Sequence, residues 1–204
     1  MSDRIFFTSS VAALAAIGAA FFIYSQSANS ALAAEDGPGP NLVIEVGGQA
    51  QGKVVIDLLP DVAPKHVAQI VALAKAGAYN DVVFHRVIDG FMAQTGDVQY
   101  GKAGGDLTLA GTGASDMPNI PAEFSNMPFL RGVVGMARSS DPDSANSQFF
   151  IMFAPGDFLN GEYTVVGHVV EGMDVVDKIK RGDPDLNGAV VDPDKMINVV
   201  VTDK

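Results

Sequence analysis

Residues 84–97 read FHRVIDGFMAQTGD, and their alternation is the most informative pattern of the chain. In a strand, side chains two residues apart share one face, so Phe84, Arg86 and Ile88 are expected side by side. After a glycine turn, Met92 and Gln94 would again share a face. Burying an unpaired guanidinium costs several kcal/mol. The arginine is therefore either neutralised by a partner elsewhere in the chain or used in binding or reaction.

The composition indicates one folded domain. The chain has 204 residues, of which 48% are hydrophobic and 18% are charged, as is typical of a packed globular domain. The net charge of −11 leaves no basic stripe, so we expect no nucleic-acid partner. The absence of cysteine excludes thiol nucleophiles, disulfides and iron–sulfur clusters.

Residues 1–33 have the features of an export signal. Arg4 precedes an apolar run over residues 5–24, and Ala-Leu-Ala at residues 31–33 offers small side chains at the positions that signal peptidase reads. The apolar run is also long enough to span a membrane once. Two alternatives therefore stay open, a cleaved signal peptide and an uncleaved membrane anchor. A Pro/Gly-rich linker over residues 34–40 then leads into the folded domain, residues 41–204.

Short strands and two helices are expected in the folded domain. Residues 42–59 read as a hairpin, and residues 64–77 read as a helix that begins with a proline and ends at a glycine. Residues 96–127 have few apolar runs and predict a long ordered surface excursion. Further strands are expected within residues 82–88, 91–95, 131–138, 147–154, 163–170 and 195–203, and a short second helix within residues 172–182. Without alternation of strands and helices, this order favours a mainly β, antiparallel barrel.

The predicted strand SQFFIMF, residues 147–153, shows the same two-residue alternation as the first stretch. Gln148 and Phe150 share one face, and the apolar residues between and after them point the other way. Phe158 and Leu159 lie in the loop that follows. Such an apolar wall, with two amides and one arginine, could accept a compact uncharged group whose peptide oxygen needs a donor. The set contains no nucleophile–base pair and no carboxylate dyad, which suits a reaction that breaks no bond.

Four motifs together resemble the cyclophilin-type peptidyl-prolyl cis–trans isomerases: FHRVIDGFMAQTGD, GVVGMAR, NSQFFIMFA and FLNGEYTVVGHVVEGMDVVDKI. The similarity covers about residues 41–203, and several ordered motifs are more specific than any single one. The resemblance implies a closed eight-stranded antiparallel barrel capped by two α-helices. It also implies an enzyme that accelerates isomerisation of X-Pro bonds during protein folding by stabilising the twisted amide without covalent chemistry.

The resemblance further implies the setting of the enzyme. Its partners would be proline-containing segments of client proteins, and no cofactor is expected. We expect a monomer in a bacterial periplasm, attached to the inner membrane only if residues 5–24 are not removed. A non-catalytic proline-peptide-binding or chaperone module, which could lose Arg86, is the alternative.

By the same resemblance, Arg86 takes the catalytic position. The substrate-binding positions fall on Phe91, Met92, Gln94, Ala137, Gln148, Phe150, Phe158, Leu159 and Tyr163. Three positions depart from the pattern common in the family. Arg138 stands where asparagine is frequent, Phe158 where many eukaryotic members have tryptophan, and Tyr163 where they have histidine. The last two resemble bacterial members, and the missing indole donor implies weak binding of cyclosporin.

Two further patterns could hold an ion. His66, His85 and His168 have no ligand spacing, so we expect no metal site, and His85 should be a hydrogen-bonded residue inside the barrel. Residues 183–194, DPDLNGAVVDPD, carry oxygen side chains at EF-hand positions. However, prolines intrude, and a strand follows where the motif needs a helix. We expect an acidic turn here, with a calcium-dependent role as the remaining alternative.

Overall fold

The structure is a computed structural model that describes residues 35–203. The predicted signal peptide or membrane anchor, residues 1–33, lies outside the described residues. No helix within residues 35–203 is both long enough and apolar enough to cross a bilayer.

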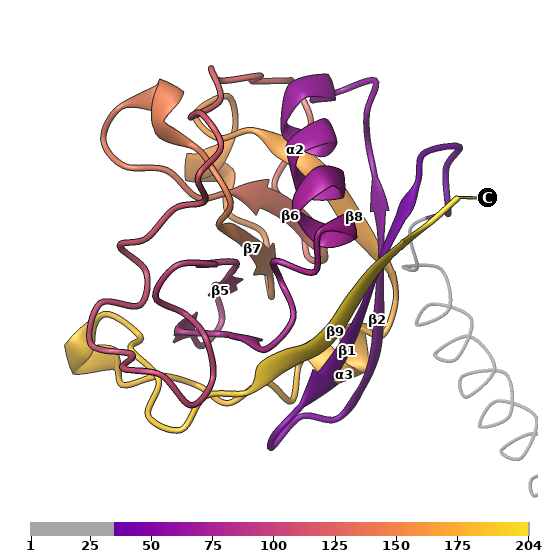
Figure 1. The fold of residues 1–204 in the computed structure, drawn as a ribbon. Coiled ribbons are helices and arrows are strands. Elements are labelled where there is room, and N and C mark those ends of the chain that lie inside the picture. Colours follow the sequence, from indigo (N-terminus) through magenta and orange to yellow (C-terminus); the bar gives the residue numbers. More distant parts are fainter. Residues whose placement is uncertain (1–34, 204) are drawn as a thin grey trace, which may run out of the picture. The chain divides into compact units, whose positions relative to one another are not determined.

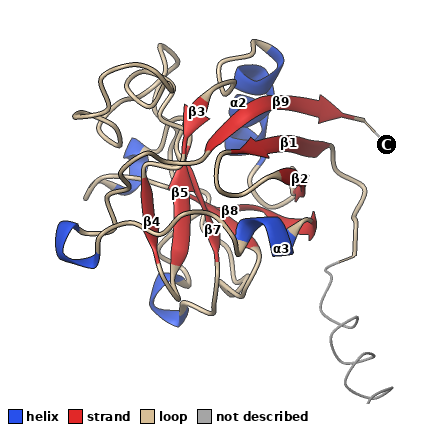
Figure 2. Cartoon of the chain, turned by 90° about the horizontal axis from the view of Figure 1, so that it is seen from below, coloured by secondary structure: helices blue, strands red, loops and turns tan. Residues whose placement is uncertain are grey.

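One curled antiparallel sheet forms the framework of the domain (Figures 1 and 2). Neighbouring strands pair antiparallel throughout, which confirms the mainly β prediction. In sheet order the strands are β3 (Val82–Val83), β9 (Lys195–Thr202), β1 (Asn41–Gly47), β2 (Gly52–Leu58), β8 (Val165–Glu171), β6 (Val133–Met136), β7 (Phe149–Met152), β5 (Met92–Thr95) and β4 (Arg86–Ile88).

The sheet has nine strands where eight were expected, because the predicted strand 82–88 divides into β3 and β4. Phe84 and His85 form the link, and this link interrupts the two-residue alternation. Phe84 packs in the main core with Val87, while Arg86 is only half-buried. The expectation that Phe84 and Arg86 share a strand face is therefore wrong. In the described sheet, β3 and β4 are the two edge strands. They are connected covalently through Phe84 and His85, and no ladder of hydrogen bonds pairs them.

The helix α2 (Pro64–Lys75) confirms the first predicted helix, and its N-terminus is capped from far along the chain. Ala63, at the N-cap, has no side chain that could accept a hydrogen bond. The carboxylate of Glu123 replaces it, accepting from the backbone N–H groups of Lys65 and His66 at 3.1 Å and from His66 Nδ1 at 2.7 Å. The long excursion thereby fixes the helix to the barrel.

The second helix, α3 (Met173–Val176), is a single turn and is shorter than predicted. It packs against β2, whereas α2 packs against β9. The two helices lie at opposite ends of the curled sheet (Figures 1 and 2). Within residues 35–203, three 3-10 turns complete the regular structure: η1 (Pro142–Ser144), η2 (Asp157–Leu159) and η3 (Pro184–Leu186).

The excursion between β5 and β6 has neither helix nor strand, as predicted. It is ordered instead by the buried carboxylate of Asp97. Four backbone N–H groups donate to this carboxylate, those of Gln99, Tyr100, Gly111 and Gly113. Because each buried donor is satisfied, the excursion can hold a fixed shape without a sheet ladder.

Strand β7 is buried on both of its faces. Phe149 and Ile151 point into the main core, whereas Phe150 and Met152 belong to a second apolar cluster on the opposite face. The buried members of the second cluster are Met92, Phe129, Val133, Phe150, Met152, Leu159 and Val165. This arrangement explains why the strand sequence is continuously apolar, and it provides a rigid base for the site described next.

Candidate functional site

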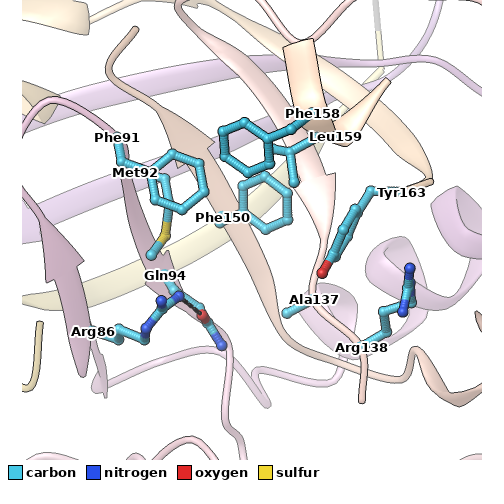
Figure 3. Close-up of a pocket in the computed structure, with 10 residues that line it drawn as sticks. All are labelled: Arg86, Phe91, Met92, Gln94, Ala137, Arg138, Phe150, Phe158, Leu159 and Tyr163. Carbon is cyan, nitrogen blue, oxygen red and sulfur yellow. Dashed lines mark hydrogen bonds between the residues drawn. The ribbon is translucent and has the colours of Figure 1, made fainter. Parts of the chain in front are cut away.

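A cavity of about 230 Å³ lies over the second apolar cluster (Figure 3). It is lined by Arg86, Phe91, Met92, Gln94, Ala137, Arg138, Phe150, Phe158, Leu159 and Tyr163. Nine of the ten site residues expected from the sequence therefore line one cavity. The tenth, Gln148, lines an adjoining cavity of about 420 Å³, which shares Gln94, Ala137 and Arg138 with the first.

The register of the sheet sets the floor of this cavity. Arg86 on β4 is paired with Gln94 on β5, Gln94 with Phe150 on β7, and Phe150 with Gly135 on β6. Residues paired across an antiparallel ladder project on the same face. A guanidinium, an amide and a phenyl ring therefore stand in a row across three neighbouring strands.

Gly135 ends this row because there is no space for a side chain. A Cβ atom added there would lie 2.5 Å from Phe150 Cζ and 2.6 Å from Phe129 Cε1. The rings of Phe129 and Phe150 stack with their centroids 5.8 Å apart, and the rings of Phe150 and Tyr163 meet edge to face with their centroids 5.9 Å apart. The glycine of the GVVGMAR motif thus lets the floor ring sit deep enough to leave a cavity above it.

The guanidinium of Arg86 is held by neutral groups from two sides. Its Nη1 donates to Gln94 Oε1 at 3.2 Å, and its Nε and Nη2 donate to the backbone oxygen and to Oδ1 of Asn187, each at 3.0 Å. Arg86 forms none of the ion pairs found among residues 35–203. Partial burial lowers the pKa of Arg86 below its ordinary value, yet a guanidinium stays charged at neutral pH. An uncompensated positive charge therefore stands at the edge of an apolar cavity.

The two predicted amides continue the network that holds Arg86. Gln94 Nε2 donates to Gln148 Oε1 at 3.0 Å, and Gln148 Nε2 donates to the carbonyl oxygens of Gly111 and Gly113 at 3.1 and 2.8 Å. The buried Asp97 carboxylate fixes the same two glycines through their N–H groups. Gln94 is thus oriented by a chain of hydrogen bonds that ends in the ordered excursion.

The turn η2 supplies one wall of the cavity. Leu159 is buried, whereas Phe158 is 70% exposed and contacts Phe91, with ring centroids 5.4 Å apart. The turn is anchored by Asn160, whose Oδ1 accepts from the backbone N–H of Phe129 at 2.8 Å. The two aromatic rings therefore form an apolar lip beside a buried leucine.

Tyr163 and Arg138 form the side opposite Arg86 (Figure 3). The Arg138 guanidinium carbon lies 4.3 Å from the centre of the Tyr163 ring, a cation–π contact. Arg138 also donates to the backbone oxygens of Glu162 and Ser139 at 2.9 Å. Its side chain is only 13% exposed, so this arginine supports the wall. The sequence shows Arg138 directly after Ala137, but it does not predict the contact of Arg138 with the Tyr163 ring.

The two ion-binding patterns do not gather ligands. Among the described residues, no group of three or more His, Cys, Asp or Glu side chains could hold a metal ion. In the acidic loop, Asp183 accepts from the N–H of Asp185, while the buried Asp194 accepts from the N–H groups of Gln49, Ala50 and Lys180. The first and last carboxylates of the EF-hand pattern are thus engaged with different backbone segments.

His85 is buried, as expected. Neither of its ring nitrogens has a partner in good hydrogen-bond geometry within residues 35–203, but the Val83 backbone and the Gln148 side chain lie close enough to favour its charged form. The strand break places the ring beside the excursion, where a Cβ on Gly111 would lie only 3.0 Å from it. Burial lowers the pKa of His85 to about 4, against the opposing effect of the Asp97 charge.

Asn187 was missed by the sequence analysis. The dipeptide Asn187-Gly188 signals a turn, but nothing in its local sequence indicates a partner 101 residues away. The sequence pattern places Asn187 only in the acidic loop, residues 183–194. Its contact with Arg86 could be found only once the loop was placed against β4.

Comparisons with known proteins agree with this geometry. The family described as "Cyclophilin type peptidyl-prolyl cis-trans isomerase/CLD" matches residues 42–201. A Brucella suis protein named "Probable peptidyl-prolyl cis-trans isomerase" is 63% identical over 152 residues, which are 74% of this chain and 78% of that protein.

Two solved structures are also similar. The cyclophilin AquaCyp293 from Hirschia baltica aligns with a TM-score of 0.65 and 27% identity, over 80% of this chain and 74% of that chain. A Cryptosporidium parvum cyclophilin type isomerase, crystallised in the presence of the dipeptide Ala-Pro, shares the fold with a TM-score of 0.67 and 24% identity, over 80% and 99%. The chain therefore belongs to the cyclophilin family and is a peptidyl-prolyl cis–trans isomerase that acts on proline-containing peptides.

Proposed function

We propose that Arg86 carries the catalysis by stabilising the twisted form of the X-Pro amide. Resonance keeps the amide planar and sets a rotation barrier of about 18–20 kcal/mol. In the twisted form the prolyl nitrogen becomes pyramidal and gains a lone pair that can accept a hydrogen bond. A donor fixed toward that nitrogen favours the twisted form over both planar forms, which is the requirement for catalysis.

The hydrogen bonds of Arg86 leave donors free for this role. A guanidinium has five N–H groups. Within the described residues three of them are used, one each on Nε, Nη1 and Nη2. One N–H on each terminal nitrogen therefore remains for a substrate, one for the prolyl nitrogen and one for the preceding carbonyl oxygen.

The apolar part of the cavity supports the other half of the proposal. At about 230 Å³ it is smaller than the roughly 300–1,000 Å³ of sites for drug-sized ligands, so it suits one compact ring. We propose that Met92, Phe150 and Leu159 hold the proline ring while the preceding residues rotate. None of the lining residues in the described part of the chain offers a carboxylate, thiol or imidazole, in keeping with a reaction that forms no covalent intermediate.

The observation that carries the proposal is the uncompensated charge of Arg86. A structural arginine would be paired with a carboxylate, whereas within residues 35–203 this one is oriented only by neutral oxygens, and it lines the cavity. A site that only bound proline peptides would not need such a charge. Gln94 and Gln148 then serve to orient it, and Ala137, Phe91, Phe158 and Tyr163 complete the walls.

A protease-coupled isomerisation assay tests this mechanism against the binding module. A chromogenic X-Pro peptide, cleaved only in its trans form, should be converted faster in proportion to the concentration of the full-chain protein. A protein that binds the peptide in a titration but leaves the cis-to-trans rate unchanged would support the non-catalytic alternative.

We also propose that the protein is exported to the periplasm and acts there as a monomer. The support for export is the apolar run at residues 5–24 with the small residues at 31–33. The monomeric state is what the resemblance to the family implies. Mass spectrometry of protein isolated from periplasmic and membrane fractions tests export, and light scattering on the purified protein tests the monomer. A species that begins near residue 34 is expected, while a full-length species in membranes would indicate the anchor.

A further inference from the structure

The loop of residues 182–190 contacts Arg86 through both backbone and side chain. We propose that this loop is a positioning element for the catalytic arginine and that Asn187 is its positioning residue. The proposal rests on the catalytic role proposed for Arg86. It gives the acidic loop a task in the reaction that does not involve an ion.

The backbone of the loop runs along the free edge of β4. Gly182 N donates to Val87 O at 2.9 Å, and Val87 N donates to Gly188 O at 2.8 Å. Val190 N donates to His85 O at 3.1 Å, and Arg86 forms an isolated bridge with Ala189. The other edge of β4 is paired with β5. Arg86 is therefore fixed between two hydrogen-bonded neighbours, although β4 lies at the edge of the sheet.

The side chain of Arg86 is held in the same way. Gln94 accepts from Nη1 on the side of β5, and Asn187 accepts from Nε and Nη2 on the side of the loop. Together the two partners fix the plane of the guanidinium. A long side chain loses much rotational freedom when it is used, so one that is already held keeps its free donors in the reactive position.

The local conformation explains why an asparagine stands at position 187. Its φ is 55°, in the left-handed region that asparagine tolerates better than most residues. Gly188 follows with a φ of 79°, and a Cβ on it would lie 2.5 Å from Ile88 Cγ1. The glycine thus permits close approach to β4, and the asparagine turns its two oxygens toward Arg86.

The turn η3 closes the loop behind Asn187. Asp183 O accepts from Gly188 N at 2.8 Å, and the Asp183 carboxylate accepts from Asp185 N at 2.9 Å. The left-handed residue is therefore held in a closed turn. The carboxylate at the first EF-hand position stabilises that turn, and this use accounts for its place in the sequence.

The substitution Asn187→Gly tests the side-chain contact alone. Glycine tolerates the left-handed backbone and keeps the carbonyl acceptor, but it removes the carboxamide side chain and with it the Oδ1 acceptor of Arg86 Nη2. We expect kcat to fall about three- to tenfold with KM within about twofold of the wild-type value, because the proline cavity is unchanged. Asp192→Gly is the matched control: Asp192 is also left-handed, with a φ of 48°, and lies in the same acidic segment, but no hydrogen bond joins it to Arg86. It should leave kcat unchanged.

A double-mutant cycle separates positioning from a structural effect. In the Arg86→Ala background, Asn187→Gly should cause no further loss of rate, measured by exchange NMR at near-stoichiometric enzyme. An equal loss in both backgrounds, or an unchanged kcat in the single variant, would overturn the proposal.

The Nη–H resonances of Arg86 give a readout that does not depend on activity. They are assigned by their disappearance in Arg86→Ala, and the Nη2–H resonance, whose acceptor Oδ1 is removed, should shift and broaden in Asn187→Gly. An unchanged sharp resonance would refute the positioning role even if the wild-type protein proved inactive. Failure of Arg86→Ala to reduce the rate would instead count against the proposed catalytic role.

Discussion

Acidification should destabilise the domain through His85. The ring is buried without a well-formed hydrogen bond among the described residues, and burial lowers its pKa from 6.5 to about 4. Between these two pH values the unfolded chain binds more protons than the folded one. The contribution of neutral His85 to the free energy of unfolding is therefore complete above pH 6.5. It is lost as the pH falls toward 4. The neighbouring charges are Asp97, which opposes the lowered pKa, and Arg86, which adds to it.

The size of the effect follows from the two pKa values. Lowering a histidine pKa from 6.5 to about 4 corresponds to about 3 kcal/mol of unfolding free energy, of which roughly 2.5 kcal/mol is lost between pH 7 and about pH 4.5. The variant His85→Leu has no group to protonate at this position. Its free energy of unfolding should therefore fall by roughly 2.5 kcal/mol less than that of the wild type between pH 7 and about pH 4.5.

Urea denaturation provides the assay. The chain has no tryptophan, so unfolding is followed by far-UV circular dichroism or tyrosine fluorescence, at about pH 7 and about pH 4.5, with m-values compared to check two-state behaviour. Carboxylates titrate in both proteins and cancel in the comparison. Equal losses of stability in the wild type and in His85→Leu would refute the reasoning, because the destabilisation would then come from other groups.

Three further outcomes are expected. Gly135→Ala should destabilise the fold by about 1–3 kcal/mol and raise KM, because the added Cβ pushes the Phe150 ring into the cavity. A variant with the stability and KM of the wild type would contradict the close packing described at Gly135. Cyclosporin should inhibit weakly, and Phe158→Trp should increase inhibition by supplying an indole donor at the exposed lip; nanomolar inhibition of the unmodified enzyme would contradict the assignment of this position. Millimolar calcium or a chelator should leave the melting temperature unchanged, whereas a clear rise with calcium would indicate an ion site in residues 183–194.

The features that could be predicted from the sequence are those encoded within one element. The two-residue alternation predicts that Phe150 lies on one face of β7 and that Phe149 and Ile151 lie on the other. The structure confirms this prediction. The proline at position 64 and the apolar spacing after it predicted α2 within two residues of its observed end. The resemblance then selected residues that the structure gathers around a cavity, although their individual roles stay predictions.

The missed features depend on contacts between distant segments. The break at Phe84 and His85 arises because Phe84 N donates to Asp194 O and His85 O accepts from Val190 N. Both partners, Val190 and Asp194, lie in the segment just before β9. Glu123 caps α2 from 57 residues away along the chain. Such hydrogen bonds override local alternation and leave no signal in the sequence of either segment. The number of strands was therefore wrong for the same reason that Asn187 was missed.

The central claim, that Arg86 stabilises the twisted amide, is tested most directly by the rate constant of Arg86→Ala on an X-Pro peptide. Loss of a fixed donor that acts in the twisted state should lower kcat/KM by about 100-fold or more. Circular dichroism and peptide affinity serve as controls, since the fold and the apolar cavity should remain. A folded Arg86→Ala variant with kcat/KM within about threefold of the wild-type value would contradict the account.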